Sequence, residues 1–386
     1  MDNWGLDAQL TGIKQQHLYR ARQTVGSPQG TVLTIAGQQL VNFSSNDYLG
    51  LANHPDVVKA FQRASDEYGV GSGSAHLICG HSAEHQALEE ELAEFTGRQR
   101  ALLFSTGYMA NLGVMSALVG SGDDVFQDKL NHASLIDAGQ LSSARCRRYL
   151  HANTHRLVQL LERSTGNKKL IVTDGVFSMD GDEAPIEELV RLSEQSGAVL
   201  MVDDAHGLGV LGKTGGGLLQ QHALTQQQVP ILMGTFGKAF GTFGAFVAGS
   251  DALIETLIQR ARTYIYTTAA PAALMAATRE SLILVQKESW RREKVSDLAA
   301  RFRAGAEQLG LNVQGSNSAI QPIVIGDSDK ALAVSSRLKA KGFLVSAIRE
   351  PTVPKGSARL RVTITATHTE TQVDALLDAV SAAIKP

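Results

Sequence analysis

Short apolar runs recur through the first two thirds of the chain and alternate with stretches of helical periodicity. The runs stand at Ala101–Phe104, Leu170–Thr173, Ala198–Val202, Pro230–Gly234 and Ala245–Gly249, and Asp123–Gln127 looks like a further strand. Continuous apolar runs of this length predict strands that are buried on both faces of a sheet. Amphipathic segments between them, such as Pro185–Ser196, predict helices that cover those faces. The pattern therefore predicts an α/β fold with a mainly parallel sheet.

The two ends of the chain have a different pattern. A polar helix is predicted over Leu6–Arg22, and a hairpin over Thr31–Ile35 and Gln39–Phe43, which alternate around a short turn. Later segments predict a helix at Leu253–Thr263, an extended segment at Tyr264–Thr268, a long helical region at Ala272–Leu309, strands at Ile320–Ile325, Leu344–Ile348 and Ala358–Thr365, and helices at Lys330–Lys341 and Thr371–Ile384. We therefore predict an N-terminal segment (1–45), a large domain (46–275) and a smaller α+β C-terminal domain (276–386).

Composition narrows the class of protein. The 386 residues are 43% hydrophobic and carry a net charge of −2, so neither nucleic acid nor an anionic membrane is expected as the main partner. Cys79 and Cys146 have neither metal-ligand spacing nor the number needed for a disulfide framework. The start of the chain resembles no secretory signal, and no apolar run approaches membrane-spanning length. We expect a soluble, cytoplasmic protein without a metal site.

Polar clusters follow the predicted strands. They are Ser105–Asn111, Asn131–Ser134, Asp174–Gly181, Asp203–Gly207 and Thr235–Gly241. Ligands of parallel sheets bind beyond the carboxyl ends of the strands, so these clusters predict one site. Each residue also has a simpler interpretation: Asp203 is a possible helix cap, His132 a surface or capping residue, and Asn46 a cap for the helix near Pro55–Tyr68.

Lys238 lies among small residues directly after the Pro230–Gly234 run. A lysine amine that loses solvation has a lowered pKa and can form a Schiff base, although a solvated lysine in a glycine-rich turn is the alternative. Together with its neighbours it meets the demands of pyridoxal 5'-phosphate (PLP): Asp203 for the pyridine nitrogen, His132 to stack on the ring, and His206 for the ring hydroxyl. The phosphate is expected at Gly107, Tyr108 and Met109, where a helix begins, and at Thr235.

These clusters, with Asn42–Leu51, resemble the α-oxoamine synthases, which are fold-type I PLP enzymes, over essentially the whole chain. The resemblance implies a large domain with a mainly parallel seven-stranded sheet between helices, a small α+β domain, and a homodimer with shared active sites. It also implies decarboxylative condensation of an amino acid with an acyl thioester.

The resemblance further implies residue roles. Lys238 would carry PLP and act as the base, with Asp203, His132, His206 and Ser178 around the ring. Thr267 and Thr268 would reach the phosphate of the neighbouring subunit. The substrate contacts implied are Arg20, Asn46, His132, Arg349 and Thr352.

The segment Ala347–Gly356, followed by Arg359-Leu360-Arg361, looks like the biotin-pathway member, which joins L-alanine to a pimeloyl thioester. Glycine C-acetyltransferase, which joins glycine to acetyl-CoA, is the main alternative, because the residues around the cofactor are shared. A silent cofactor-binding relative and an ordinary aminotransferase remain alternatives from other classes. The sequence leaves open whether the acyl group arrives on CoA or on a carrier protein.

Two positions depart from the family pattern. Asp174 stands where a Glu is expected, which puts a bond to Asn46 in doubt. Glu350 stands beside Arg349, where a small residue or proline is commoner; it either pairs with Arg349 or points to water, and the second is favoured because exposed neighbours interact weakly.

Overall fold

The computed structural model describes residues 4–385, which form two compact units. The large unit comprises Leu49–Ser178 and Glu183–Arg292, and the small unit comprises the described residues of Met1–Tyr48, Met179–Asp182 and Glu293–Pro386. The domain limits predicted from the sequence stay a prediction.

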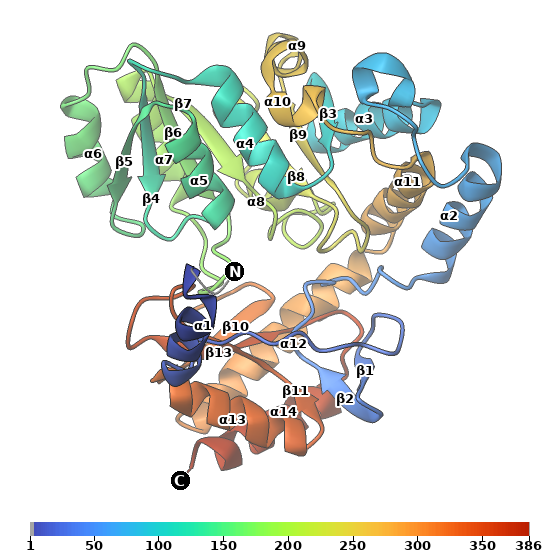
Figure 1. Ribbon diagram of the computed structural model, residues 1–386, viewed down its shortest axis with the longest axis vertical. Helices are drawn as coiled ribbons and strands as arrows, with labels where there is room; N and C mark the ends of the chain where they lie inside the picture. Colours follow the sequence, from blue (N-terminus) through green and yellow to red (C-terminus); the bar gives the residue numbers. More distant parts are fainter. Residues whose placement is uncertain (1–3, 386) are drawn as a thin grey trace. The chain divides into compact units, whose positions relative to one another are not determined.

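A seven-stranded sheet forms the centre of the large unit (Figure 1). In spatial order its strands are β3 (Arg100–Phe104), β9 (Ala245–Gly249), β8 (Ile231–Thr235), β7 (Val199–Asp203), β6 (Lys169–Asp174), β4 (Asp124–Asp128) and β5 (Arg145–Tyr149). All neighbouring pairs are parallel except the two that involve β9, which runs antiparallel to both β3 and β8. This confirms the mainly parallel sheet predicted from the apolar runs.

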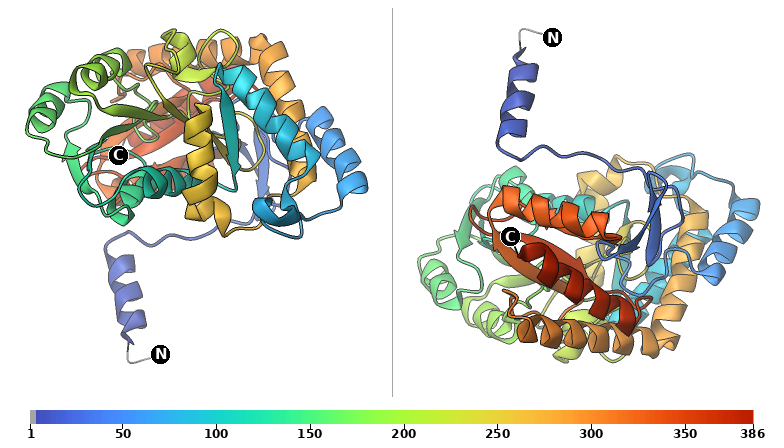
Figure 2. Two further views of the ribbon diagram at one scale, coloured as in Figure 1. Left: turned by 90° about the horizontal axis from the view of Figure 1, so that it is seen from above. Right: turned by 90° about the horizontal axis from the view of Figure 1, so that it is seen from below.

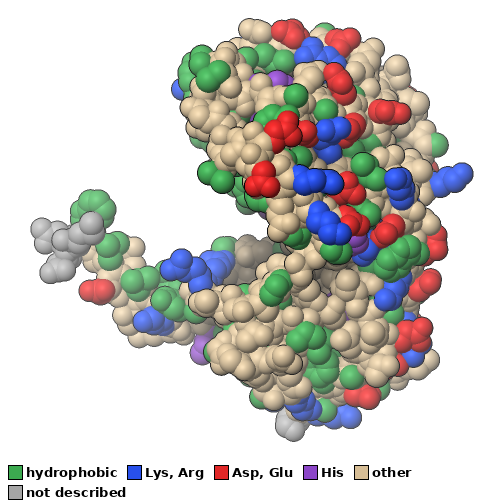
Figure 3. All heavy atoms as spheres, turned by 90° about the vertical axis from the view of Figure 1, so that its right-hand side faces the viewer, with side chains coloured by type: hydrophobic (Ala, Val, Ile, Leu, Met, Phe, Trp, Pro, Cys, Tyr) green, Lys and Arg blue, Asp and Glu red, His purple; other side chains and the backbone are tan. Residues whose placement is uncertain are grey.

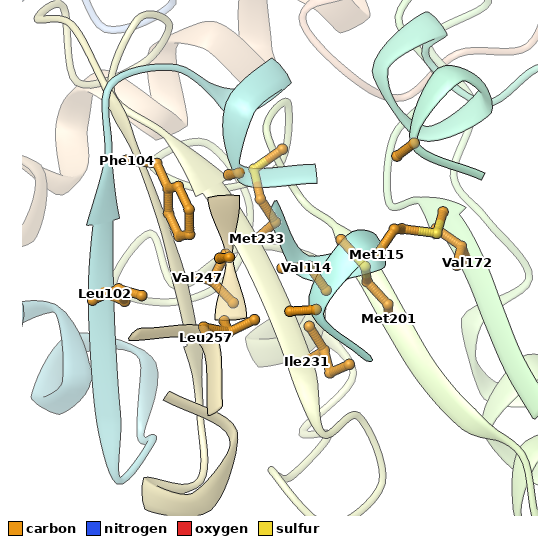
Figure 4. Packing of buried hydrophobic residues seen from close by; sticks show 14 of the residues in the cluster. Leu102, Phe104, Val114, Met115, Val172, Met201, Ile231, Met233, Val247 and Leu257 are labelled. Atoms are coloured by element: carbon orange, nitrogen blue, oxygen red, sulfur yellow. The ribbon is translucent and has the colours of Figure 1, made fainter. Parts of the chain in front are cut away.

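Side chains of the central strands alternate between two buried faces. In β7, Met201 packs in one apolar cluster, and Leu200 and Val202 pack in the other. Figure 4 shows the first cluster, in which Val114 and Met115 of α4 pack against strand residues such as Ile231. Burial on both faces explains why these strands are mainly apolar.

Helices cover both faces and one side of the sheet. Helices of the large unit are α2 (Pro55–Tyr68), α3 (Ala83–Thr96), α4 (Gly107–Leu118), α5 (Ala133–Leu141), α6 (Thr154–Glu162), α7 (Ile186–Ser196), α8 (Gly217–Gln221), α9 (Asp251–Arg260), α10 (Arg262–Ile265) and α11 (Ala272–Lys287), with a π-helical turn at His76–Gly80. Helices α4, α5, α9 and α10 contribute to the first cluster, and α6, α7 and α8 to the second.

Three elements of the large unit differ from the prediction. Strand β5 was not predicted, because its sequence Arg-Cys-Arg-Arg-Tyr is polar; as an edge strand it has solvated side chains. The segment predicted as extended from Tyr264 instead begins within the short helix α10. The long helical region from Ala272 is divided at Glu288 into α11 and α12 (Ser289–Gln308), with neither Pro nor Gly at the break.

The small unit contains two three-stranded sheets, β1–β2–β11 and β10–β13–β12. Their strands are β1 (Val32–Ile35), β2 (Gln38–Asn42), β10 (Ile320–Gly326), β11 (Phe343–Leu344), β12 (Ser346–Ile348) and β13 (Ala358–Thr363). Strands β1 and β2 form the predicted antiparallel hairpin. The single strand predicted over Leu344–Ile348 is wrong in one respect, because the chain passes between the two sheets at Val345.

The helices of the small unit are α1 (Leu6–Gln15), most of α12, α13 (Ser328–Ala340) and α14 (Glu370–Ile384). Helices α13 and α14 lie side by side in the right-hand view of Figure 2. They enclose a core with β10 and β13 that includes Phe302, Ile323, Leu360 and Leu376. Helix α1 is shorter than the predicted helix, since it ends before His17.

The surface mixes charges, and the face in Figure 3 shows acidic and basic side chains interspersed. Within residues 4–385, no helix is long and apolar enough to cross a membrane.

Candidate active site

Two buried carboxyl groups end adjacent strands of the large unit. Asp174 closes β6 and Asp203 closes β7, where the register pairs them directly. Each side chain is only 3% exposed. Asp203 accepts hydrogen bonds from Asn111 Nδ2 at 2.8 Å and from the Ala205 N–H at 3.1 Å. These donors stabilise its charged form at a buried position.

His132 lies at the start of α5, the helix that follows β4. Its backbone N–H donates to Asp174 Oδ2 at 2.6 Å, so the carboxyl at the end of β6 fixes the backbone at the start of α5. Its Nδ1 lies 2.7 Å from Ser134 Oγ and accepts from the Ser134 N–H at 3.3 Å. The imidazole is therefore held at one edge by its own helix, while the residue as a whole remains exposed.

Electrostatic interactions connect these three side chains with a fourth, Lys238. Burial raises the pKa of Asp174 well above its ordinary value; Asp203 raises it further, while the His132 N–H bond and Lys238 oppose the shift. Burial also lowers the pKa of His132, as does Lys238, against the effects of Asp203 and Asp137. Lys238, His132 and Asp203, predicted as one site, thus lie within electrostatic range in the large unit.

The Lys238 loop joins β8 to β9. The Phe236 N–H donates to Gly244 O at 2.9 Å, and the Gly241 N–H donates to Lys238 O at 2.9 Å, so the loop is closed at both ends. Gly241 has a φ of +66°, and a Cβ there would lie 2.3 Å from Ala52 N. Lys238 itself is half-buried, whereas Gly237 beside it is exposed, so one side of the loop is open.

The N-terminus of α4 has free donors. Thr106 caps the helix, its Oγ1 accepting from the Met109 N–H at 3.1 Å. Among the described residues, the Gly107 and Tyr108 N–H groups have no acceptor. Such groups and the helix dipole favour an anion. Gly107 and Tyr108 are therefore better phosphate donors than Met109, whose N–H is already used.

Thr235 lies half-buried at the end of β8. Its Oγ1 donates to Gly244 O at 2.9 Å and accepts from the Gly237 N–H at 3.3 Å. The large unit thus offers an amine, a buried carboxylate, an imidazole and free helix donors. This set of groups fits PLP.

Asp204 occupies a separate pocket directly after Asp203. Its side chain is fully buried, and its Oδ2 accepts from the Leu218 N–H at 2.7 Å, whereas its Oδ1 has no partner among the described residues. A Cβ at Gly207 would lie 2.1 Å from Oδ1, and a Cβ at Gly217 2.0 Å from Oδ2. Burial raises the pKa of Asp204 well above its ordinary value.

The remaining predicted cofactor residues also belong to the large unit. His206 is buried after β7, and Ser178 is half-buried after β6. Thr267 and Thr268 follow α10, and the second is exposed.

The predicted substrate contacts Arg20, Asn46, Arg349 and Thr352 belong to the small unit. Arg349 is half-buried, and its Nη1 donates to His17 O. Burial and the nearby Arg20 guanidinium lower the pKa of Arg349. Among the described residues neither arginine forms an ion pair, and Glu350 forms none either, in agreement with the expectation that it does not pair with Arg349.

Asn46 has partners of its own in the small unit. Its Oδ1 accepts from Arg361 Nη1 at 3.1 Å and from the Tyr48 hydroxyl at 3.4 Å. Thr352 is exposed, and its N–H donates to Arg349 O at 3.0 Å, in a turn.

Sequence reasoning did not assign a role to Asn111 or Ser134, which connect His132 to Asp203. Asn111 is fully buried in α4, a helix whose other residues from Ala110 to Leu118 are small or apolar apart from one serine. A lone amide in such a helix requires a buried partner, and that was the available signal.

Comparisons with known proteins identify the family of this chain. The model for "Aminotransferase class I and II" matches residues 38–380. The 8-amino-7-oxononanoate synthase of Methylococcus capsulatus is 60% identical over 375 residues, which cover 97% of each chain.

Solved structures show the same likeness. A serine palmitoyltransferase from S. paucimobilis with a bound PLP–myriocin aldimine has a TM-score of 0.93 and 30% identity, covering 98% of this chain and 96% of that one. The 8-amino-7-oxononanoate synthase of Francisella tularensis has a TM-score of 0.79 and 33% identity, covering 90% of this chain and 98% of that one. The chain therefore belongs to the class I and II aminotransferase family and, within it, to the 8-amino-7-oxononanoate synthases.

Proposed function

We propose that this chain condenses L-alanine with pimeloyl-CoA, or with the pimeloyl-acyl carrier protein, in biotin biosynthesis. The products are 8-amino-7-oxononanoate, CO2 and free CoA or carrier protein. The observation that carries the proposal is the 60% identity to an 8-amino-7-oxononanoate synthase over 97% of each chain. The cluster of Lys238, His132 and Asp203 supports it, because each side chain suits a separate demand of PLP.

The large unit would hold the cofactor. Lys238 Nζ would attach the cofactor, Asp203 would hold a proton on the pyridine nitrogen, and His132 would lie against the cofactor ring. His206 and Ser178 lie toward the ring hydroxyl. The phosphate would bind at the free N–H groups of Gly107 and Tyr108, beside Met109 and Thr235, with Thr267 and Thr268 of the neighbouring subunit. When bound, PLP supplies an electron sink for the negative charge at the amino acid Cα.

Proton transfer is assigned to groups of this chain. With its amine free, Lys238 Nζ would take the proton from Cα of L-alanine. The same carbon then attacks the thioester, and the thiol leaves. After loss of CO2, a proton returns to this carbon from Lys238 or His132. Asp203 keeps the charge needed for these steps, since Asn111 and the Ala205 N–H donate to its carboxylate.

The small unit would bind the substrates. Arg349 holds the carboxylate of L-alanine, and Arg20 meets the acyl group, whose far end is a second carboxylate. The lowered pKa of Arg349 supports this role, because two guanidinium groups without an acidic partner are stabilised by a bound anion. Asn46 and Thr352 complete the proposed substrate contacts. We further propose a homodimer with shared active sites in the cytoplasm.

The test is thioester-dependent thiol release with two substrate pairs, L-alanine with pimeloyl-CoA and glycine with acetyl-CoA. Release with the first pair alone is expected. Release with the second pair alone would overturn the substrate assignment in favour of glycine C-acetyltransferase, and release with neither would overturn the reaction itself. Mass measurement of the product and of CO2 checks the decarboxylation.

A further inference from the structure

A continuous chain of hydrogen bonds connects His132 to Asp203 through two buried residues with no assigned role. His132 Nδ1 lies 2.7 Å from Ser134 Oγ, Ser134 Oγ accepts from Asn111 Nδ2 at 2.8 Å, and the same Nδ2 donates to Asp203 Oδ2 at 2.8 Å. Ser134 and Asn111 are 1% and 0% exposed, so water does not compete for the two bonds that Asn111 donates.

The charge on Asp203 fixes the direction of this chain at Asn111. A carboxylate accepts and never donates, so it must face the NH2 end of the amide. The second hydrogen of that NH2 group then points to Ser134 Oγ. Rotating the amide would place its oxygen against the carboxylate, at a fully buried position where repulsion is costly. Asp203 therefore makes Ser134 Oγ an acceptor from Asn111.

The direction continues to the imidazole. With its oxygen accepting from Asn111, the Ser134 hydroxyl has its one hydrogen available for His132 Nδ1. The backbone N–H of Ser134, which can only donate, also points at Nδ1 at 3.3 Å. Both donors require Nδ1 to be without a hydrogen. A proton on Nδ1 would face the Ser134 N–H, and one of these bonds would be lost.

We propose that Asn111 and Ser134 are positioning residues that hold His132 as the neutral tautomer with its proton on Nε2, under the control of the charge on Asp203. Among the described residues Nε2 has no hydrogen-bond partner, so its N–H is the end that a bound molecule meets. The burial that lowers the pKa of His132, together with the charge of Lys238, acts in the same direction; Asp203 and Asp137 oppose it.

This inference deepens the proposed function and rests on it in one respect: it decides which group returns the proton. To give up a proton as an acid, His132 would first have to be imidazolium, with hydrogens on both nitrogens. The Ser134 donors disfavour that form. His132 is then a hydrogen-bond donor through Nε2–H, and Lys238 Nζ is the group that both removes and returns the proton at the substrate carbon.

Nitrogen NMR of the PLP-loaded enzyme labelled with [15N]histidine tests the tautomer directly. The His132→Gln variant identifies the His132 signals. A pyridine-like Nδ1 and a protonated Nε2 are expected in the wild-type enzyme. The opposite pattern, or imidazolium at neutral pH, would overturn the proposal. Failure of the substrate assay would not alter this spectrum, so the two proposals fail separately.

Two variants test the chain of bonds. In Asn111→Ala, Ser134 Oγ is free to accept from Nδ1–H, so the proton affinity of His132 should rise about tenfold, as one hydrogen bond is reversed. In Ser134→Ala the Nδ1 resonance should move, because a donor is lost. Ser193→Ala removes another buried hydroxyl of the large unit, whose one hydrogen bond to a residue of 4–385 goes to Val190 O, and should change neither property. A His132 titration and spectrum unchanged in both test variants would contradict the proposal.

Discussion

Asp203 and Asp204 are adjacent in the sequence, but their surroundings differ in kind. Asp203 is bounded by donors: the Asn111 amide and the Ala205 N–H. Asp204 is instead enclosed by closely packed backbone, since Gly207 and Gly217 approach its carboxylate so closely that neither position has room for a Cβ. The first environment favours a charged carboxylate, and the second, with one oxygen unpartnered, disfavours it. Two adjacent aspartates therefore have different tasks: Asp203 belongs to the proposed cofactor site, and Asp204 belongs to a closely packed pocket.

The largest effect is expected on the Asp203 side. Lys238→Ala removes both the imine and the base, so turnover should fall by at least about 10²–10⁴-fold while thermal unfolding is unchanged. Thiol release and calorimetry measure the two properties. Lys213→Ala, which changes an exposed lysine of the large unit, should retain full activity. Appreciable turnover in Lys238→Ala would remove this residue from the mechanism.

The next largest effect is expected on the Asp204 side and concerns stability. Gly217→Ala combines a left-handed backbone (φ +81°) with a Cβ placed 2.0 Å from Asp204 Oδ2. We expect a loss of about 2–5 kcal/mol in the free energy of unfolding. Gly37→Ala is the matched control, because its φ is +80° but a Cβ there would meet no atom of the described residues within 4 Å. It should cost only about 1–2 kcal/mol. Equal losses in urea unfolding would show that the Asp204 pocket is not tightly packed.

Replacing each of the two carboxylates by an amide should affect PLP binding differently. Asp203→Asn cannot hold the pyridine proton, and loss of one charge-assisted bond should weaken PLP binding by roughly 10- to 100-fold. Asp204→Asn should leave PLP affinity within about threefold, since its pocket is formed by backbone. Absorbance titration of the cofactor-free proteins gives both constants. Similar losses in both variants would abolish the distinction.

The smallest effect is a pH dependence. The pKa of Asp204 is raised in the folded state, so the folded protein holds that proton more tightly than the unfolded chain. Its contribution to stability is complete below the ordinary aspartate pKa and is lost as pH rises. Asp204→Asn should therefore lose less stability than wild type between acid and alkaline pH.

Urea unfolding of both proteins across that range checks this sign. Glu89, whose pKa burial raises to about 7, acts in the same direction in both proteins and cancels. The exposed Asp66→Asn serves as control. A steeper alkaline loss in Asp204→Asn than in wild type would contradict the prediction.

The apolar pattern predicted the sheet well because six of its seven strands are buried on both faces. It failed at β5, where three arginines reflect an edge facing solvent, and at Leu344–Ile348, where one apolar run serves two sheets. Periodicity reports burial, and it does not report which sheet a strand joins.

Within the candidate site, only the residues that follow the ends of strands could be predicted from the sequence. Lys238, His132 and Asp203 follow predicted strands, and topology brings the ends of those strands together. Asn111 lies inside a helix, and its bond to Asp203 joins positions far apart in the sequence. Such a contact follows from three-dimensional packing, which spacing along the chain does not contain. The Asp204 pocket was missed for the same reason.

The antiparallel strand β9 has a consequence for the order of folding. It turns the Lys238 segment into a hairpin, in which Thr235 pairs with Ala245, whereas Phe104 must reach the same Ala245 from much earlier in the chain. Closing a short loop costs less chain entropy than a long one and takes less time. We expect the lysine hairpin to form early and without help from the rest of the sheet. His132 and Asp203 join it only when the slower, long-range strand pairings are complete. The loop that carries Lys238 therefore forms first, and the charged groups that surround its amine come together last.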